Sequence, residues 1–140
     1  MHYAGPARWL LLALGMMLST QVLAGDVGFT VTRLQDVRSF QPHDGFRLAP
    51  LAQTSELNIR LNNLEAHIKR HTHPQTGHFL YVIQGRIELT VEQEIRIINA
   101  GDFVTVPQNV PHSMRRLGAL EALFLDVSSP PHVGDVIWHE

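Results

Sequence analysis

Short segments with alternating apolar residues, separated by turn sequences, recur along most of this chain and constrain its fold. Leu57, Ile59 and Leu61 alternate with Asn58 and Arg60, which is typical of a strand with one buried face. Turn-forming residues interrupt the apolar segments at 41–45, 84–85, 92–94, 99–102 and 107–111. No segment beyond the N-terminal region has a convincing helical period. About nine or ten short strands with regular turns predict an all-β sandwich or barrel.

The strands that this pattern predicts cover residues 29–34, 57–61, 66–73, 79–84, 86–92, 95–98, 103–106 and 120–127. Odd positions of Ala66–His73 share one face, so His71 and His73 point the same way. The segment Phe79–Gln84 is apolar at nearly every position, which favours a strand covered on both faces and indicates a homodimer.

The first 24 residues have the build of a secretory signal peptide. Met1–Arg8 is weakly positive, and Trp9–Leu18 is an apolar run too short to span a bilayer comfortably. Ser19–Ala24 ends in a Val-x-Ala cleavage pattern. An uncleaved membrane anchor is the alternative. We expect cleavage after Ala24, a mature domain of residues 25–140 that is periplasmic or secreted, and no stable membrane insertion after cleavage.

The composition excludes other classes of protein. A chain of 140 residues is long enough for one domain with a core. The formal charge of −2 and the single lysine leave no electrostatic footprint for nucleic acid, so no nucleic-acid partner is expected. The absence of cysteine rules out disulfides, so an exported domain must depend on its core, helped by a metal or a partner subunit.

Histidines are concentrated at two places that a β fold can bring together. His71, His73 and His78 lie within eight residues, on both sides of a turn, and His112 follows a proline-rich loop. Because imidazole is the commonest side-chain ligand of late first-row divalent metals, this pattern predicts a mononuclear metal site inside a β-barrel.

Two motifs of this chain resemble those of the cupin superfamily. The first cupin motif is usually written G-x5-H-x-H-x3,4-E-x6-G, and His71, His73 and Gly85 match it. His78 stands where the glutamate normally stands, and Glu65 replaces the leading glycine. Because the glutamate is absent, the usual sphere of three histidines and one carboxylate is put in doubt, although imidazole can replace the missing donor.

The second cupin motif, G-x5-P-x-G-x2-H-x3-N, is matched at Gly101, Pro107 and His112. Asn109 replaces the second glycine, and both residue types tolerate left-handed backbone angles. Arg116 replaces the final asparagine. The resemblance covers about residues 57–127, with the motifs within 65–116, and its strength lies in the combination and order of the matches.

The resemblance implies a cupin-type jelly-roll β-barrel that holds one divalent transition metal ion at one end. Carried over position by position, the implied metal ligands are His71, His73, His78 and His112. An all-nitrogen set suits Fe, Mn, Ni, Cu, Co or Zn and disfavours calcium and magnesium. Four neutral imidazoles also leave the full charge of the cation in place, which makes the site more Lewis-acidic.

Several residues have a functional and a structural interpretation. His78 is either a ligand or a histidine at the barrel mouth. His67 is expected to be a packed or hydrogen-bonded core histidine, whereas the remaining histidines of the domain are expected at the surface: His43, His132 and His139. Arg115 and Arg116 either bind an acidic substrate or lie at an exposed strand end. Three large aromatic residues at strand spacing either line a pocket or belong to the core or to a subunit interface: Phe79, Tyr81 and Phe103.

Two functions of different class follow. The first is an exported metal-dependent enzyme, dioxygenase- or oxidase-like or an isomerase, acting on a small oxygenated molecule. In cupins resembling quercetin dioxygenase the motif glutamate is implicated as a base, and this chain has no acidic residue there, so no catalytic residue is assigned. The alternative is a non-catalytic extracytoplasmic protein that binds a metal or a small ligand. A third, weaker option is a cupin whose metal site serves only stability.

Overall fold

The structure is a computed structural model that describes residues 30–131 and 134–140. The predicted signal peptide, residues 1–24, lies outside the described residues. Contacts divide the chain into a unit Met1–Val31 and a unit Thr32–Glu140, and the fold below is that of the second unit. Within the described residues, no helix has both the length and the apolarity needed to cross a membrane.

Apart from one short 3-10 helix, the regular secondary structure of the described residues is all β-strand, which confirms the predicted all-β class. One 3-10 helix, Leu34–Asp36, precedes the strands. The strands are β1 (Gln41–His43), β2 (Phe46–Gln53), β3 (Asn58–Leu64), β4 (His67–Thr72), β5 (Gly77–Gln84), β6 (Arg86–Val91), β7 (Glu94–Asn99), β8 (Phe103–Val106), β9 (His112–Leu117), β10 (Ala122–Ser129) and β11 (Ile137–Trp138).

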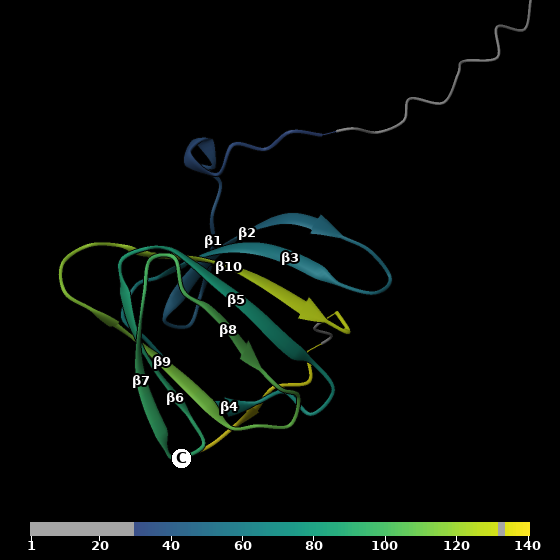
Figure 1. Ribbon diagram of the computed structural model, residues 1–140. Coiled ribbons are helices and arrows are strands. Elements are labelled where there is room, and N and C mark those ends of the chain that lie inside the picture. The colour runs from purple at the N-terminus through teal and green to yellow at the C-terminus, as the bar shows by residue number, and fades with distance from the viewer. Residues whose placement is uncertain (1–29, 132–133) are drawn as a thin grey trace, which may run out of the picture. The chain divides into compact units, whose positions relative to one another are not determined.

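The strands form two antiparallel sheets that face each other, as Figure 1 shows. One sheet has the order β1-β2-β3-β10-β5-β8 and the other β11-β4-β9-β6-β7. Strands distant in sequence are neighbours in both sheets, for example β3 with β10 and β4 with β9. The chain passes from one sheet to the other between β3 and β4 and again between β9 and β10, which confirms the predicted jelly-roll barrel.

Inward-facing apolar residues of both sheets form the core, as expected where every second side chain points inward. Its buried members are Leu64, Ile68, Leu80, Val82, Ile87, Leu89, Ile98, Val106, Met114, Ala122 and Phe124. The larger sheet is apolar at one end, where Leu64 lies opposite Ala122. At its other end Ser128 lies opposite both Asn58 and His78. The barrel interior is therefore apolar at one end and polar at the other.

The predicted strand at residues 29–34 is wrong for residues 30–34, which the structure describes. Residues 30–33 form no strand, and Leu34 begins the 3-10 helix. The strand β2, in contrast, was not predicted, because Pro50 interrupts a segment whose apolar residues on both sides do not alternate with polar ones. The structure accommodates Pro50 beside an irregularity in the pairing of β2 with β3, where a ladder hydrogen bond is dispensable.

The turn between β1 and β2 requires glycine at position 45. Gly45 has φ of +82°, a backbone conformation that side chains with a Cβ rarely adopt. A Cβ atom there would lie 1.9 Å from the carbonyl oxygen of His67. The predicted turn at 41–45 is therefore a short strand, β1, followed by a tight turn that packs against the start of β4.

An irregularity in β4 contradicts the prediction that its odd positions share one face. Ile68 lies opposite Met114 and His71 lies opposite His112, so β4 has one more residue than β9 between these pairs. This bulge lets both Ile68 and His71 face inward, although an even-numbered and an odd-numbered residue of a regular strand would face opposite sides. His67 and Lys69 are consequently exposed, so the prediction that His67 is a core histidine is wrong.

The strand β5 is buried on one face only in the single chain. His78, Leu80 and Val82 are buried, whereas Phe79 and Tyr81 are 39% and 44% exposed. The sequence pattern thus predicted the position of the strand correctly. Within one chain, however, the strand is covered on one face and not on both.

Candidate metal centre

The four predicted histidines are all buried at the polar end of the barrel. His71 lies in β4 after the bulge, and His73 follows directly after that strand. His78 lies near the start of β5, and His112 opens β9 after the proline-rich loop. Because β4 pairs with β9, residues far apart in sequence reach the same end of the interior.

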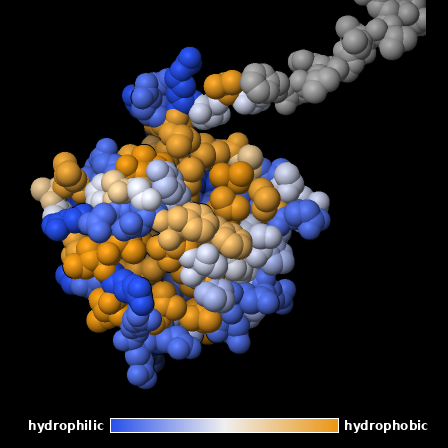
Figure 2. Space-filling view, viewed as in Figure 1, coloured by the Kyte–Doolittle hydropathy of each residue, from blue (hydrophilic) through white to orange (hydrophobic). Residues whose placement is uncertain are grey.

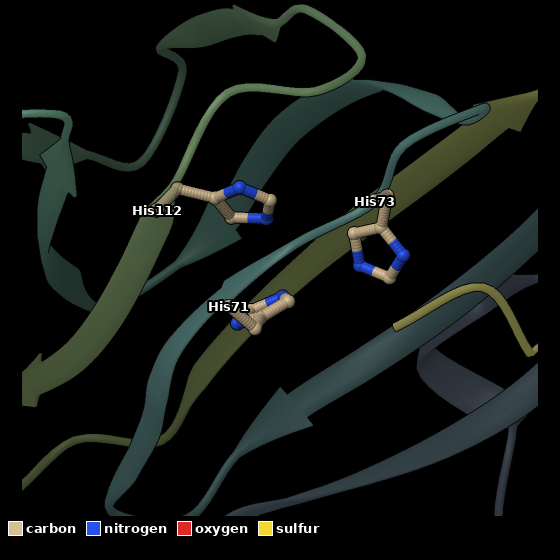
Figure 3. A group of neighbouring side chains, drawn as sticks. All are labelled: His71, His73 and His112. Carbon is tan, nitrogen blue, oxygen red and sulfur yellow. The ribbon is translucent and has the colours of Figure 1, made fainter. Parts of the chain in front are cut away.

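Three of these side chains, His71, His73 and His112, are close enough to share one cation. Each offers one ring nitrogen such that the three atoms lie within 4.8 Å of one another. The ring centroids are 4.3 Å apart for His71 and His112 and 5.0 Å apart for His71 and His73. Figure 3 shows the three rings turned toward a common space. Nitrogen ligands lie about 2 Å from a metal, so only small rotations are needed for coordination.

His78 borders this group without joining it at the same spacing. Its ring centroid is 4.6 Å from that of His73 and 5.8 Å from that of His112. Its Nε2 atom is buried and has no hydrogen-bond partner among the described residues. A buried polar atom without a partner is costly, and coordination to a cation would satisfy it.

Hydrogen bonds orient three of the four rings in the same way. The Nδ1–H of His71 donates to the carbonyl oxygen of Lys69 at 2.7 Å, and that of His112 to the carbonyl of Val110 at 2.9 Å. His78 donates through Nδ1 to the Asp126 carboxylate at 2.8 Å. Because these acceptors have no proton to give, Nδ1 carries it and the lone pair of the neutral ring is on Nε2. This is the usual arrangement of metal-ligating histidines.

The electrostatics of His112 also suit a neutral ligand. Burial, and to a smaller extent the nearby charge of His71, lower the pKa of His112 to about 4 against the opposing effect of the hydrogen bond to the Val110 carbonyl. At neutral pH the ring is therefore uncharged and can donate its lone pair to a cation.

Asp126 and Arg60 belong to the site, and the sequence analysis did not identify them. Asp126, in β10, accepts hydrogen bonds from His78 and from Arg60 of β3. Burial by itself would raise the pKa of Asp126, but the hydrogen bond from His78 and the charges of His78 and Arg60 hold it below its usual value. A usable signal existed, because Asp126 interrupts the inward apolar positions of β10.

A cavity of about 180 Å³ adjoins the histidines inside the barrel. One wall is polar and includes Arg60, Asn62 and Asp126 beside the four histidines. The rest of the wall is mostly apolar and is made by Phe46, Leu48, Ile68, Leu80, Met114 and Phe124, with His43, Asp44, Val136 and Trp138 completing the lining. The candidate metal centre therefore opens onto a space that a small molecule can occupy.

The other histidines singled out in the sequence lie elsewhere. His43 is exposed and stacks on Phe46 with ring centroids 5.1 Å apart, although it also lines the cavity. His139 is exposed and its ring nitrogen lies 2.6 Å from the Thr72 hydroxyl. His132 lies outside the described residues. The surface predictions for His43 and His139 are confirmed.

The arginines and aromatics singled out in the sequence do not line the cavity. Arg115 forms an exposed ion pair with Glu88 at 2.7 Å, which supports the strand-end interpretation. Phe79, Tyr81 and Phe103 are exposed on the outside of the larger sheet. Any ligand specificity must therefore come from other side chains.

The donors fit a transition-metal ion. Three buried imidazoles within reach of one point, and a fourth beside them, match the nitrogen preference of such ions. No carboxylate of the described residues joins the three-histidine group. The group alone does not identify the metal, since several divalent ions accept the same donors.

Comparisons with known proteins agree with this architecture. Residues 61–128 match the sequence model of the cupin domain. The chain is 32% identical over 73 residues to polyketide synthase CurC of Streptomyces cyaneus, covering 49% of this chain and 47% of that protein. It is 36% identical over 45 residues to quercetin 2,3-dioxygenase of Bacillus subtilis strain 168, covering 32% of this chain and 13% of the enzyme. The aligned region thus spans less than half of either curated relative.

A solved structure extends the likeness to most of the barrel. The structure of KdgF from Halomonas sp. is similar with a TM-score of 0.64 and 25% identity, covering 69% of this chain and 89% of that one. The matched sequence region contains the four histidines and the jelly-roll strands that hold them. The protein is a member of the cupin superfamily, with a small single cupin domain.

Proposed function

We propose that this protein is a metal-dependent enzyme acting on a small oxygenated molecule, by dioxygenase- or oxidase-like chemistry or by isomerisation. One observation carries the proposal: buried histidines, two of them held by hydrogen bonds from Nδ1 to backbone carbonyls, line a cavity of about 180 Å³. We propose His71, His73, His78 and His112 as ligands of a single Fe, Mn, Ni, Cu, Co or Zn ion. Such an ion would act as a Lewis acid that polarises substrate oxygens.

The cavity indicates the size and chemistry of the ligand. At about 30 Å³ per water, its volume corresponds to about six water molecules. Because the metal ligands are neutral and Arg60 is paired with Asp126, the cation would leave the cavity positively charged. The preferred ligand is therefore small and carries an anionic or easily ionised oxygen, such as a carboxylate or an enol. Apolar walls would exclude water from its other end.

The side chains of the barrel have separate roles in this proposal. Asp126 holds the His78 ring, and its low pKa keeps it ionised, which suits an anchor better than a general base. Asn62 lines the cavity with a buried side-chain oxygen that has no partner among the described residues, so it can accept a hydrogen bond from the ligand. Asn62 is therefore assigned to orienting the substrate.

A non-catalytic binding protein is the second candidate. It is favoured because His78 replaces the glutamate of the cupin motif and because Asp126 is engaged with His78 and Arg60. Neither residue offers an obvious site for proton transfer. In this case the same cavity would hold a metal or a small ligand without turnover.

Turnover assays distinguish the two candidates. Protein loaded separately with each metal would be offered flavonols, 1,3-diketones and small hydroxy- and keto-acids, with oxygen uptake and product formation measured. We expect turnover with at least one metal and its loss in His112→Ala. Ligand binding in calorimetry with no product from any chelating compound would instead support the binding protein. Elemental analysis of protein from its native compartment would identify the metal.

We also propose that the domain works outside the cytoplasm, in the periplasm or as a secreted protein. The proposal comes from the predicted signal peptide. Mass spectrometry of the protein from the extracytoplasmic fraction tests it, with a mature N-terminus at Gly25 as the expected result. A full-length chain in the cytoplasm would contradict it.

A homodimer is the proposed oligomeric state. Phe79 and Phe103 stack with ring centroids 6.5 Å apart, and Phe103 is 64% exposed. Figure 2 shows hydrophobic residues gathered on the face over β5 and β8. An exposed aromatic cluster of this kind is typical of a protein–protein contact.

A further inference from the structure

The C-terminal residues 134–140, here called the C-terminal strap, lie against the candidate metal centre. Its strand β11 pairs with β4, with Ile137 opposite Thr72 and Trp138 opposite His71. We propose that the C-terminal strap is a working part of the metal centre, in which Asp135 positions His73 and Trp138 covers His71. This inference rests on the proposed metal site and adds to it residues outside the cupin motifs.

Asp135 supplies the link to His73. Its carboxylate accepts a hydrogen bond from the backbone N–H of Gln75 at 2.9 Å and lies 3.5 Å from the Thr76 hydroxyl. The oxygen that faces the Thr76 hydroxyl, Oδ1, also lies 3.7 Å from Nδ1 of His73, whereas Oδ2 accepts the Gln75 hydrogen bond. Both side chains are largely buried, at 11% and 7% exposure. The carboxylate is thus held by the β4–β5 connection in position to orient His73.

At His73 a carboxylate at ion-pair distance, longer than a hydrogen bond, takes the place that a hydrogen-bond acceptor has at the other three histidines. Their Nδ1 atoms donate to acceptors within the barrel, at Lys69, Val110 and Asp126. At His73 the carboxylate beside Nδ1 comes from the C-terminal strap instead. Partners of this kind fix the ring orientation and raise ligand basicity, and their loss typically lowers metal affinity about 10–100-fold.

Trp138 makes the second contact. Its ring centroid lies 5.1 Å from that of His71, and together with Val136 it lines the cavity. Two contacts of the next residue with β4 secure the position: the backbone N–H of His139 donates to the Arg70 carbonyl at 2.9 Å, and the His139 ring lies 2.6 Å from the Thr72 hydroxyl. Trp138 therefore stands between His71 and solvent.

Two contacts with two proposed ligands couple the C-terminal strap to the metal. If the docked strap improves the geometry of His71 and His73, a bound metal must stabilise docking by the same free energy. Metal affinity should then depend on the strap, and strap order on the metal. The cavity wall at Val136 and Trp138 would also depend on metal occupancy.

The chain contains its own reporter of this coupling. It has two tryptophans, Trp9 and Trp138, and the first lies in the predicted signal peptide. In a Trp9→Phe protein, Trp138 is the only tryptophan whether or not the N-terminus has been removed. Its emission can therefore be followed while Co²⁺ is added to the metal-free protein, because a paramagnetic ion beside His71 quenches it.

The experiment compares Co²⁺ affinities in this Trp9→Phe background. We expect quenching of Trp138 on metal addition, and affinity about tenfold weaker in Asp135→Asn. A chain ending at residue 133, followed by calorimetry because it lacks Trp138, should bind at least as weakly as Asp135→Asn. Asp102→Asn, between β7 and β8, is the control that should keep the parental affinity.

The outcomes separate this inference from the proposed function. Parental affinity in both Asp135→Asn and the shortened chain, or unchanged Trp138 emission on metal binding, overturns the role of the C-terminal strap and leaves the metal site standing. If the parent protein binds neither Co²⁺ nor another transition metal, both the role of the C-terminal strap and the proposed metal site are wrong. Should the shortened chain fail to fold, as circular dichroism would reveal, Asp135→Asn alone decides.

Discussion

Asp126 and His78 form a buried pair across neighbouring strands, with Asp126 Oδ1 2.8 Å from His78 Nδ1. Arg60 binds the second oxygen of the same carboxylate. The pair fixes the orientation of the one proposed ligand that departs from the cupin motif. Because Asp126 lies between the ring of a proposed ligand and the Arg60 guanidinium, its replacement is the strictest test of how the candidate site is held together.

Replacement of Asp126 by alanine should cost about 3–5 kcal/mol of stability, because it leaves Arg60 as an uncompensated buried charge. Asp126→Asn should be milder for stability and still reduce metal affinity about tenfold. Urea denaturation and metal titration measure the two effects. Glu94→Ala is the matched control, since its ion pair with Arg96 is exposed and worth about 1 kcal/mol or less. Equal losses in both alanine variants would contradict the assignment.

Loss of the His112 ring should abolish most metal binding, whereas loss of the His43 ring should not. His112 belongs to the three-histidine group, and His43 lies at the cavity lining outside it. Elemental analysis of His112→Ala and His43→Ala, purified identically, measures occupancy. His78→Ala tests the fourth ligand: reduced occupancy supports coordination, and parental occupancy with parental affinity rejects it. The same occupancy in His112→Ala and His43→Ala would refute the whole assignment.

The metal-free protein should lose stability as the pH falls from about 6.5 toward 4. Folding lowers the pKa of His112 from 6.5 to about 4 through burial, so in this range the unfolded chain binds a proton that the folded chain does not. Stability therefore rises with pH across this window, by about 3 kcal/mol from this residue. Urea denaturation at several pH values checks the slope, which should be shallower in His112→Gln. Identical slopes in parent and variant would contradict this account.

A methyl group at position 45 should be far more damaging than one at position 101. Both glycines have positive φ, at +82° and +96°, so each alanine carries the backbone penalty of about 1 kcal/mol or more. At Gly45 the added Cβ also meets the His67 carbonyl oxygen at 1.9 Å, whereas nothing lies within 4 Å of it at Gly101. We expect Gly45→Ala to cost about 3 kcal/mol or more in denaturation experiments. A smaller loss than in Gly101→Ala would disprove this.

The proposed dimer should dissociate when a charge enters its aromatic cluster. Phe103 stacks on Phe79 and is 64% exposed, so glutamate there is tolerated in the monomer and opposed in an apolar interface. Light scattering after size-exclusion chromatography should give a dimer for the parent and a monomer for Phe103→Glu. Leu120→Glu, at a 69% exposed loop position, should leave the dimer intact. A monomeric parent at all concentrations would rule out the interface.

Much of the barrel was predictable because its signals are local. The turns at Gly85 and at Asn99–Asp102 follow from glycines that adopt positive φ at positions 85 and 101, whereas Glu92 adopts a positive φ that its residue type does not favour. The strand Phe103–Val106 has the bounds that its sequence predicted, since Pro107 ends it. The strand β2 was not predictable, because Pro50 breaks its pattern and is accommodated only through its pairing with β3.

By itself, the sequence determined the cupin architecture and the four buried histidines at one end of a barrel. Alternation and turns predicted the all-β class, and the order and spacing of the motif residues carried the resemblance to cupins that implied the four histidines. Only the tertiary structure decided which faces the residues of β4 present, because the bulge is defined by its partner strand. It alone brought Asp126 to His78 and Asp135 to His73. Contacts across 48 and more residues arise from strand pairing and packing, and local sequence carries no record of them.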